Sequence, residues 1–301
     1  MSQSFEIFQQ LVLPAALFGV MVTVGMELTR RDFRDIVAAP RPVLAGVLIQ
    51  ALIFPASAFL ILAVFPLPPA TAIGLAIVAA CPSGGFSNVL TLLGRGDLAL
   101  SISLTAVSSI FAIVSLPIML PLALGIAGAS AGSEIEFLDV PLGPTVGQML
   151  LVVLLPTGIG MWLRATHPVW VQRNIDRAQQ LSQIALYGVV LVLAVQNWGS
   201  FSAGAGTSFM LASLLFAAST VSGFALARVF LPLRQAFTVS IETGTRNVGL
   251  ATLVAVSLLG NADWAAFGAV YILPGSALGF AAALLHRRAL RRARRPERAN
   301  A

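Results

Sequence analysis

Two short polar interruptions in otherwise apolar stretches contain the residues best suited to chemistry. The first covers residues 81–88 and has a proline and two glycines ahead of Ser87 and Asn88. The second covers residues 242–247 and places an acid and a base around Gly244. Proline and glycine are poor helix interior, and unwound backbone at membrane depth is tolerated only where it is buried in protein or lines a cavity. The pattern predicts a transport site, with a packing kink as the alternative.

The first interruption offers ligands for ions of either sign. A half-helix that begins near Ser87 and Asn88 would direct free amides and the positive end of its dipole at an anion. Freed carbonyls and the side-chain oxygens of the same two residues suit a hard cation such as sodium. Ser101 and Thr105 begin the next apolar stretch, and at four-residue spacing they share a helix face. We expect them to lie beside the interruption.

The second interruption carries two opposite charges, Glu242 and Arg246. Each costs roughly 2.5 to 3.5 kcal/mol in the middle of a membrane helix. On a continuous helix they would form an ion pair, which is the purely structural interpretation. Apolar residues would serve structure at lower cost, so we favour a functional role. Gln50 suits interhelical contact or ligation equally, and the single cysteine, Cys81, favours packing over ligation of a soft metal or metalloid.

The composition places both interruptions in an all-α integral membrane protein. The chain has 301 residues, 57% of them hydrophobic and 10% charged, with a mean hydropathy of +0.90, far from the values of a soluble domain. Apolar runs of about 20 residues predict nine transmembrane helices. They lie at about 7–29, 41–65, 70–93, 97–125, 144–164, 180–198, 207–230, 235–259 and 262–286. We expect one integral domain over residues 1–301, with four helices within about 7–125, five within about 144–286, and a basic tail at 287–301.

All eighteen basic residues are arginines, and all but Arg246 lie at or after the end of an odd-numbered run. The positive-inside rule then predicts a multi-pass protein of the cell inner membrane, with its N-terminus outside and its C-terminus in the cytoplasm. Because this distribution follows topology, we expect membrane lipid around the protein, no nucleic acid and no obligate protein partner. The arginine-rich tail could bind anionic lipid, although a topology anchor explains it more simply. The run at 7–29 lacks a basic start and a small-residue cleavage site, which favours a retained span.

The order of the runs suggests an internal repeat. An acidic connection at 128–143 divides the chain, and if the run at 144–164 is set aside, four runs remain on each side. The third of each four carries an interruption, and the two quartets have opposite orientations in the membrane. This is the pattern of an inverted repeat whose two broken helices cross near the midplane. Residues 168–180 predict a separate short interfacial helix, with Trp170 at headgroup depth.

The motifs resemble those of the bile acid:sodium symporter family from about Gly25 to Gly279. The likeness rests on Gly25-Met26-Glu27-Leu28-Thr29, Asp32-Phe33, Gln50, Cys81-Pro82-Ser83-Gly84-Gly85-Phe86-Ser87-Asn88, Gly94-Arg95-Gly96-Asp97-Leu98-Ala99-Leu100-Ser101 and Glu242-Thr243-Gly244-Thr245-Arg246-Asn247. The resemblance implies a panel domain, formed by the runs at 7–29, 144–164 and 180–198, and a core domain formed by the others. The two would move against each other in alternating access.

The resemblance also implies ligand sets. The first sodium site would consist of Ser87, Asn88, Ser101, Thr105 and Glu242. The second would consist of Gln50, Glu242, Thr243, Thr245 and the residue at 246. That last position departs from the common glutamine, because the guanidinium of Arg246 has no acceptor atom. We interpret its charge as a surrogate for the second sodium, which leaves that site degenerate. The substrate set would comprise Gly85, Phe86, Arg246, Asn247 and Tyr271.

Together these features predict a secondary active transporter that moves an organic anion, bile-acid-like or a small carboxylate, with sodium as the coupling ion. A proton-coupled or uncoupled carrier is the first alternative, because Arg246 could disable both cation sites through Glu242. A metalloid exporter with Cys81 as ligand is less favoured. An enzyme is not expected, since the two histidines, His167 and His286, lie at the cytoplasmic edges of the predicted helices.

Overall fold

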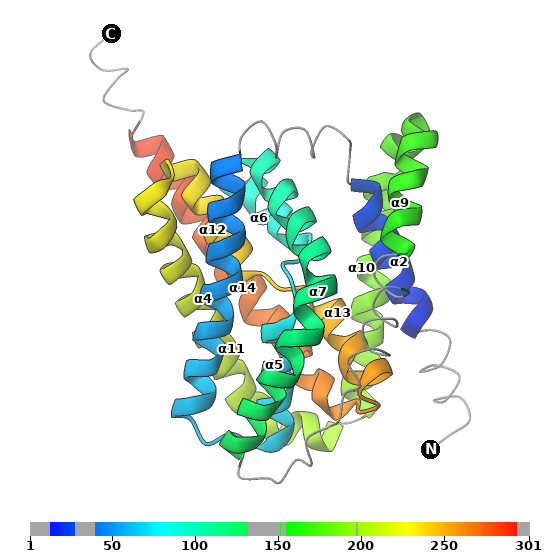
Figure 1. The fold of residues 1–301 in the computed structure, drawn as a ribbon, viewed down its shortest axis with the longest axis vertical. Coiled ribbons are helices and arrows are strands. Elements are labelled where there is room, and N and C mark those ends of the chain that lie inside the picture. Colours follow the sequence, from blue (N-terminus) through cyan, green and yellow to red (C-terminus); the bar gives the residue numbers. More distant parts are fainter. Residues whose placement is uncertain (1–12, 28–39, 132–150, 152–154, 197, 294–301) are drawn as a thin grey trace.

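The computed structural model describes residues 13–27, 40–131, 151, 155–196 and 198–293. Every element of the described part is helical, as Figure 1 shows. The α-helices are α2 (Leu13–Glu27), α4 (Pro40–Val64), α5 (Pro69–Ala80), α6 (Phe86–Gly94), α7 (Leu98–Ala131), α9 (Leu155–Thr166), α10 (Pro168–Gln196), α11 (Trp198–Phe230), α12 (Leu233–Gly244), α13 (Val248–Leu253) and α14 (Ala266–Ala293). A π-helical turn at Val254–Leu258 and a 3-10 turn at Asp263–Ala265 join the last two. The expectation of an all-helical protein is confirmed for these residues.

Three described segments are long and apolar enough to cross a membrane: Pro40–Val64, Ala205–Phe230 and Asp263–Arg292. Helix α4 shows why. Its leucines at four-residue spacing, Leu44, Leu48 and Leu52, are 60%, 60% and 64% exposed, which suits contact with lipid tails. The opposite face buries Gln50 and Phe54, also four residues apart, against the rest of the protein. The helix is therefore apolar outside and carries its polar group inside.

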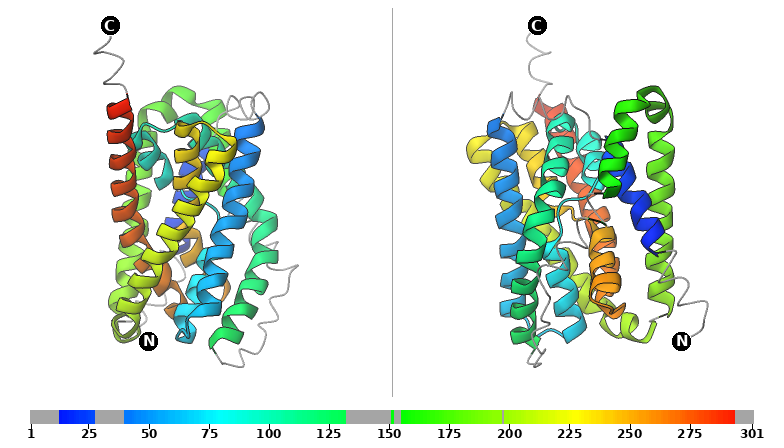
Figure 2. Two further views of the ribbon diagram at one scale, coloured as in Figure 1. Left: turned by 90° about the vertical axis from the view of Figure 1, so that its left-hand side faces the viewer. Right: turned by 45° about the vertical axis from the view of Figure 1, so that its right-hand side comes forward.

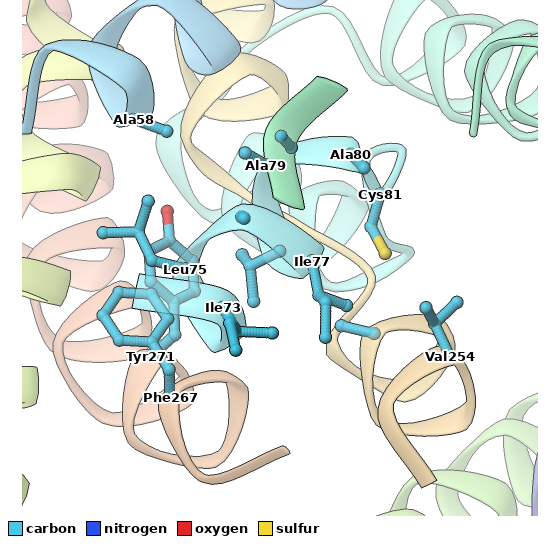
Figure 3. Packing of buried hydrophobic residues seen from close by; sticks show 14 of the residues in the cluster. Ala58, Ile73, Leu75, Ile77, Ala79, Ala80, Cys81, Val254, Phe267 and Tyr271 are labelled. Atoms are coloured by element: carbon cyan, nitrogen blue, oxygen red, sulfur yellow. The ribbon is translucent and has the colours of Figure 1, made fainter. Parts of the chain in front are cut away.

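Helix α5 is shorter than these three segments and is enclosed by the rest of the protein. All ten residues from Thr71 to Ala80 are buried, so no face of this stretch meets the surroundings. Figure 3 shows Ile73, Leu75 and Ile77 of α5 packed beside Phe267 and Tyr271 of α14. This apolar cluster forms the main core, and it holds the end of α5 where the first interruption begins.

Helices α2, α9 and α10 pack together on one side of the molecule, and α4, α5, α6, α7, α11, α12 and α14 form the other side (Figures 1 and 2). The contact between α2 and α9 is backbone against backbone at two glycines. A Cβ atom added to Gly160 would lie 2.8 Å from the Cα of Gly25 and would collide with the carbonyl oxygen of Val22. Glycine is needed here because the two helices approach too closely for any side chain.

One expectation about the elements was wrong. Residues 168–180 do not form a separate interfacial helix, because α10 runs without a break from Pro168 to Gln196. Proline is tolerated in the first turn of a helix, and no other proline or glycine precedes Gly188. Nothing in this segment therefore stops the helix between its polar and apolar parts. The acidic connection expected at 128–143 begins later than predicted, because α7 continues to Ala131, and the rest of it lies outside the described residues.

The turn formed by residues 94–97, between α6 and α7, is fastened to α12 and α14. Arg234 donates from Nε to the carbonyl oxygen of Arg95 at 3.1 Å and from Nη2 to that of Gly96 at 3.0 Å. The backbone amide of Asp97 donates to Thr238 Oγ1 at 2.8 Å. His286 Nδ1 lies 2.7 Å from the carbonyl oxygen of Gly94. We call this turn and its three partners the end clamp.

Candidate functional site at two broken helices

The first interruption separates α5 from α6 at residues 81–85. Cys81 has extended backbone, with φ of −78° and ψ of 150°, as the residue before a proline must avoid the helical region. Helix α6 starts again at Phe86, and the amides of Ser87 and Asn88 donate to the carbonyl oxygens of Gly84 and Gly85 at 3.0 and 3.1 Å. These two amides, expected to be free for an anion, already have acceptors within the turn.

The second interruption separates α12 from α13 at residues 245–247. Thr245 leaves the helix with φ of −87° and ψ of 132°. Asn247 then caps α13, because its Oδ1 accepts from the amide of Leu250 at 3.0 Å. The predicted break is confirmed, and the amide and the side chain of Asn247 both serve to hold it.

The two interruptions meet each other. The amide of Asn247 donates to the carbonyl oxygen of Pro82 at 2.9 Å. A Cβ atom added to Gly84 would lie 3.0 Å from the carbonyl oxygen of Arg246 and 3.2 Å from the Cα of Asn247. Unwound backbone from one helix thus satisfies unwound backbone from the other, which removes the cost of leaving these groups unpaired. We call this contact the crossing.

Glu242 lies beside the crossing inside a cage of four hydroxyl groups, and its side chain is fully buried. Ser83 donates to Oε2 at 2.5 Å, while Ser87 and Ser101 each donate to Oε1 at 2.6 Å. Thr105 Oγ1 is 3.1 Å from both carboxylate oxygens. Hydrogen bonds to an ionised acceptor are the strong kind. They compensate the buried negative charge without a cationic side chain.

Four residues of the first predicted sodium site are therefore brought together: Ser87, Ser101, Thr105 and Glu242. Asn88, the fifth, is half-buried at the start of α6, and its Oδ1 atom is buried without a hydrogen-bond partner. Sequence reasoning missed Ser83, whose hydroxyl makes the shortest bond to Glu242. The available signal was a hydroxyl between Pro82 and Gly84, within the break itself.

Arg246 does not pair with Glu242, so the purely structural alternative, an ion pair on a continuous helix, does not hold. The helix ends at Gly244, and within the described residues no ion pair joins the two side chains. Arg246 instead donates from Nη2 to the carbonyl oxygen of Gln50 at 3.0 Å, and its guanidinium carbon lies 3.9 Å from the ring centroid of Phe54. A guanidinium over an aromatic face is attracted by the ring. The positive charge is held by α4, not by the acid four residues away.

The remaining residues of the second predicted site divide into two groups. Near Arg246, the side-chain amide of Gln50 and the hydroxyl of Thr245 are buried without partners, as is Nε of Arg246 itself. Thr243 faces elsewhere, because its hydroxyl donates to the carbonyl oxygen of Val239 and a Cβ atom added to Gly223 of α11 would lie 3.0 Å from it. Buried polar atoms without partners are rare in native proteins, so the first group is where a ligand or water is expected.

The predicted substrate residues mostly hold the interruptions in place. Tyr271 donates its hydroxyl to the carbonyl oxygen of Gly244 at 2.5 Å, at the end of α12. Phe86 packs edge-on against Phe280 of α14, with ring centroids 5.8 Å apart. Gly85 is the residue that caps α6. Their contact with a substrate stays a prediction.

Cys81 lies in the apolar core. Its side chain is 3% exposed, at the end of α5 near Val254 (Figure 3). Over the described ranges, no group of three or more histidine, cysteine or acidic side chains gathers in a way that could hold a metal ion. The arrangement around the thiol is that of a packing residue.

Comparison with known proteins gives consistent relatives. The model of a family described as the sodium bile acid symporter family matches residues 14–203. The chain is 30% identical over 273 residues to the Arabidopsis thaliana protein named probable sodium/metabolite cotransporter BASS1, chloroplastic, covering 89% of this chain and 65% of that protein. It is 32% identical over 243 residues to the human P3 protein, covering 80% and 49%.

The match to a bacterial relative covers a larger share of that relative's length. The chain is 28% identical over 265 residues to the Bacillus subtilis protein named uncharacterized sodium-dependent transporter YocS, covering 86% of this chain and 79% of that protein. The chain thus spans less than two thirds of the first two of these relatives and more of the third.

Proposed function

Because the chain belongs to the sodium bile acid symporter family, we propose that it is a secondary active transporter that carries an organic anion across the membrane together with sodium. The observation that supports this best is the hydroxyl cage around Glu242 beside the crossing. A single buried carboxylate among neutral oxygens offers one negative charge and several oxygen ligands, the donor set that a hard monovalent cation prefers.

The cage can exchange its own hydrogen bonds for a cation. Ser87 has a second acceptor, since its hydroxyl also lies 2.9 Å from the carbonyl oxygen of Gly84. Turning the proton to that carbonyl directs the Ser87 lone pairs toward the carboxylate and removes one of the three hydrogen bonds to Oε1 of Glu242. Ser101 and Thr105 can add oxygens from α7, and the unpartnered Oδ1 of Asn88 can add another. We assign the first sodium to these residues.

Arg246 takes the place of a second sodium in this proposal. Its guanidinium offers only donors, and Gln50 and Phe54 hold it against α4. A second cation beside this fixed charge would be repelled. Gln50, Thr243 and Thr245 then form a degenerate site in which the positive charge is built in.

We further propose nine transmembrane helices in an inverted repeat, with α2, α9 and α10 as the panel and the remaining helices as the core. The separate packing of α2 with α9 and α10 supports this division. The contact between the two broken helices supports a binding site at their crossing. Alternating access would follow from movement of one group against the other.

The proposed orientation in the cell inner membrane has the N-terminus outside and the C-terminus in the cytoplasm. In Figure 1 the start of α4, the α6–α7, α9–α10 and α11–α12 turns and the end of α14 all lie at the upper end. Each of them carries arginine. One arginine-rich end is what the positive-inside rule requires of the cytoplasmic face.

Ligand-dependent stability of the purified protein tests the sodium site. Sodium, compared with choline at equal ionic strength, should raise the unfolding temperature because it binds the folded state only. Glu242→Gln keeps the shape of the side chain but removes its charge, and Asn88→Ala removes the unpartnered oxygen; both should abolish the sodium effect. Asp176→Asn on the exposed surface of α10 is the matched control and should retain it.

The same assay, together with uptake into liposomes, separates the alternatives. Taurocholate, pantoate and pyruvate represent the bile-acid-like and small carboxylate classes, and at least one should stabilise the protein further in sodium. If sodium has no effect on stability but a proton gradient drives import of such an anion, the carrier is coupled to protons and not to sodium. If arsenite protects Cys81 against an alkylating thiol reagent, the metalloid exporter would be supported instead.

A further inference from the structure

The described part of the chain buries one carboxylate and one guanidinium, and both lie at the crossing. Glu242 is fully buried and Arg246 is 7% exposed. Among the acidic and arginine side chains whose burial the structure describes, no other is buried. The formal charge enclosed by the protein at this point is therefore −1 plus +1, or zero.

The charges of Glu242 and Arg246 add to zero, although the two side chains do not form an ion pair. Hydroxyl groups surround the carboxylate, while the carbonyl oxygen of Gln50 and the ring of Phe54 hold the guanidinium. Had they formed an ion pair, the carboxylate would be occupied and unable to receive a cation. The break at residues 245–247 prevents this pairing and keeps both groups available.

A zero sum has a consequence for transport. Moving a net charge through the low dielectric of a membrane is costly and couples the movement to the membrane potential. The empty site carries no net charge. After it takes up one sodium ion and one monovalent anion, it again carries none. A second sodium or a divalent anion would break this balance.

We propose that the transport cycle is electroneutral, with one sodium ion carried for each monovalent organic anion, and that Arg246 sets this ratio. The inference rests on the proposed function and adds the charge class of the substrate to it. The sodium gradient alone then drives accumulation. Monovalent carboxylates or sulfonates are accepted, and divalent anions are excluded by charge.

Uptake into liposomes that contain the purified protein tests this ratio. An inward sodium gradient is imposed, and valinomycin with potassium sets the potential to zero or to about −100 mV inside. Radiolabelled taurocholate, pantoate and pyruvate serve as probes. Wild-type accumulation should change by less than about twofold, whereas one net charge per cycle would allow up to about 50-fold. A wild-type response near that upper limit overturns the inference.

Variants at one position supply the controls. Arg246→Lys keeps the charge and should stay insensitive to potential. Arg246→Gln removes it, so accumulation should rise with inside-negative potential as a second sodium compensates. Equilibrium dialysis of radioactive sodium gives a readout that needs no organic anion: one ion per wild-type chain is expected, and two would contradict the ratio. If no probe shows sodium-dependent uptake and no sodium binds, the transporter proposal itself fails, a result distinct from voltage-sensitive uptake.

Discussion

At the scale of single residues, the site depends on hydroxyl groups rather than on an opposite charge. Removing a cationic partner from a buried carboxylate would leave an uncompensated charge, which is strongly destabilising. Ser83, Ser87, Ser101 and Thr105 avoid this problem because each supplies a hydroxyl proton to the carboxylate, and the Ser87 hydroxyl has a second acceptor in the carbonyl oxygen of Gly84. In the proposed sodium site, the carboxylate of Glu242 would therefore be compensated in the absence of sodium and could still bind the ion.

Ser83→Ala tests the cost of losing one such proton. The hydrogen bond from Ser83 goes to a buried, charged acceptor, and bonds of this kind contribute about 1.5 to 3 kcal/mol. We expect the free energy of unfolding in sodium-free detergent to fall by about this amount. Ser103→Ala on α7 is the control, because that buried hydroxyl bonds only the carbonyl oxygen of Ala99 on its own helix. Equal losses in the two variants would contradict the role of the cage.

At the scale of helices, close contacts between glycines decide which elements can pack. Gly158 and Gly160 lie two residues apart in α9, but only Gly160 touches the backbone of α2, and nothing lies within 4 Å of a Cβ added to Gly158. Gly158→Ala should raise stability by up to about 1 kcal/mol, because alanine favours a helix. Gly160→Ala should lower it by about 1 to 2 kcal/mol through overpacking. Denaturant unfolding in detergent measures both, and the same sign for both would refute the contact.

Local signals predicted the elements better than the partners. Pro82 with its two following glycines, and Gly244, marked both interruptions, because backbone restrictions act within a few residues. The bond from Ser83 to Glu242 joins residues 159 positions apart, and no local pattern specifies which hydroxyl turns toward the acid. The four-residue spacing offered an ion pair between Arg246 and Glu242 as the structural alternative, but spacing has this meaning only on an unbroken helix. The unbroken length of α10 was missed because its charges suggested a boundary that the backbone does not require.

At the scale of the whole molecule, the arginine-rich end gives the orientation a direct test. Pro66→Cys in the turn after α4 and Gln172→Cys on α10 are both exposed, and they lie toward opposite ends of the fold. In a Cys81→Ser background, a thiol reagent that cannot cross the membrane should label position 66 in intact cells. It should label position 172 only after the membrane is opened. The reverse pattern would show that the protein has the opposite orientation in the membrane. Labelling of both positions in intact cells would exclude the proposed topology.

The end clamp has a mechanical consequence. Helices α6 and α12 are joined at the crossing and again at the turn of residues 94–97, so they are pinned at two heights along their length. Because α6 and α12 are held together at both points, they cannot separate by a hinge motion between them. In the proposed alternating access, the movement would then be a sliding of the two sides where α2 meets α13 and α10 meets α14, the sparser contacts between them. The helices joined at the crossing and at the end clamp would then move as one rigid body, and the proposed sodium site would move with them without losing its geometry.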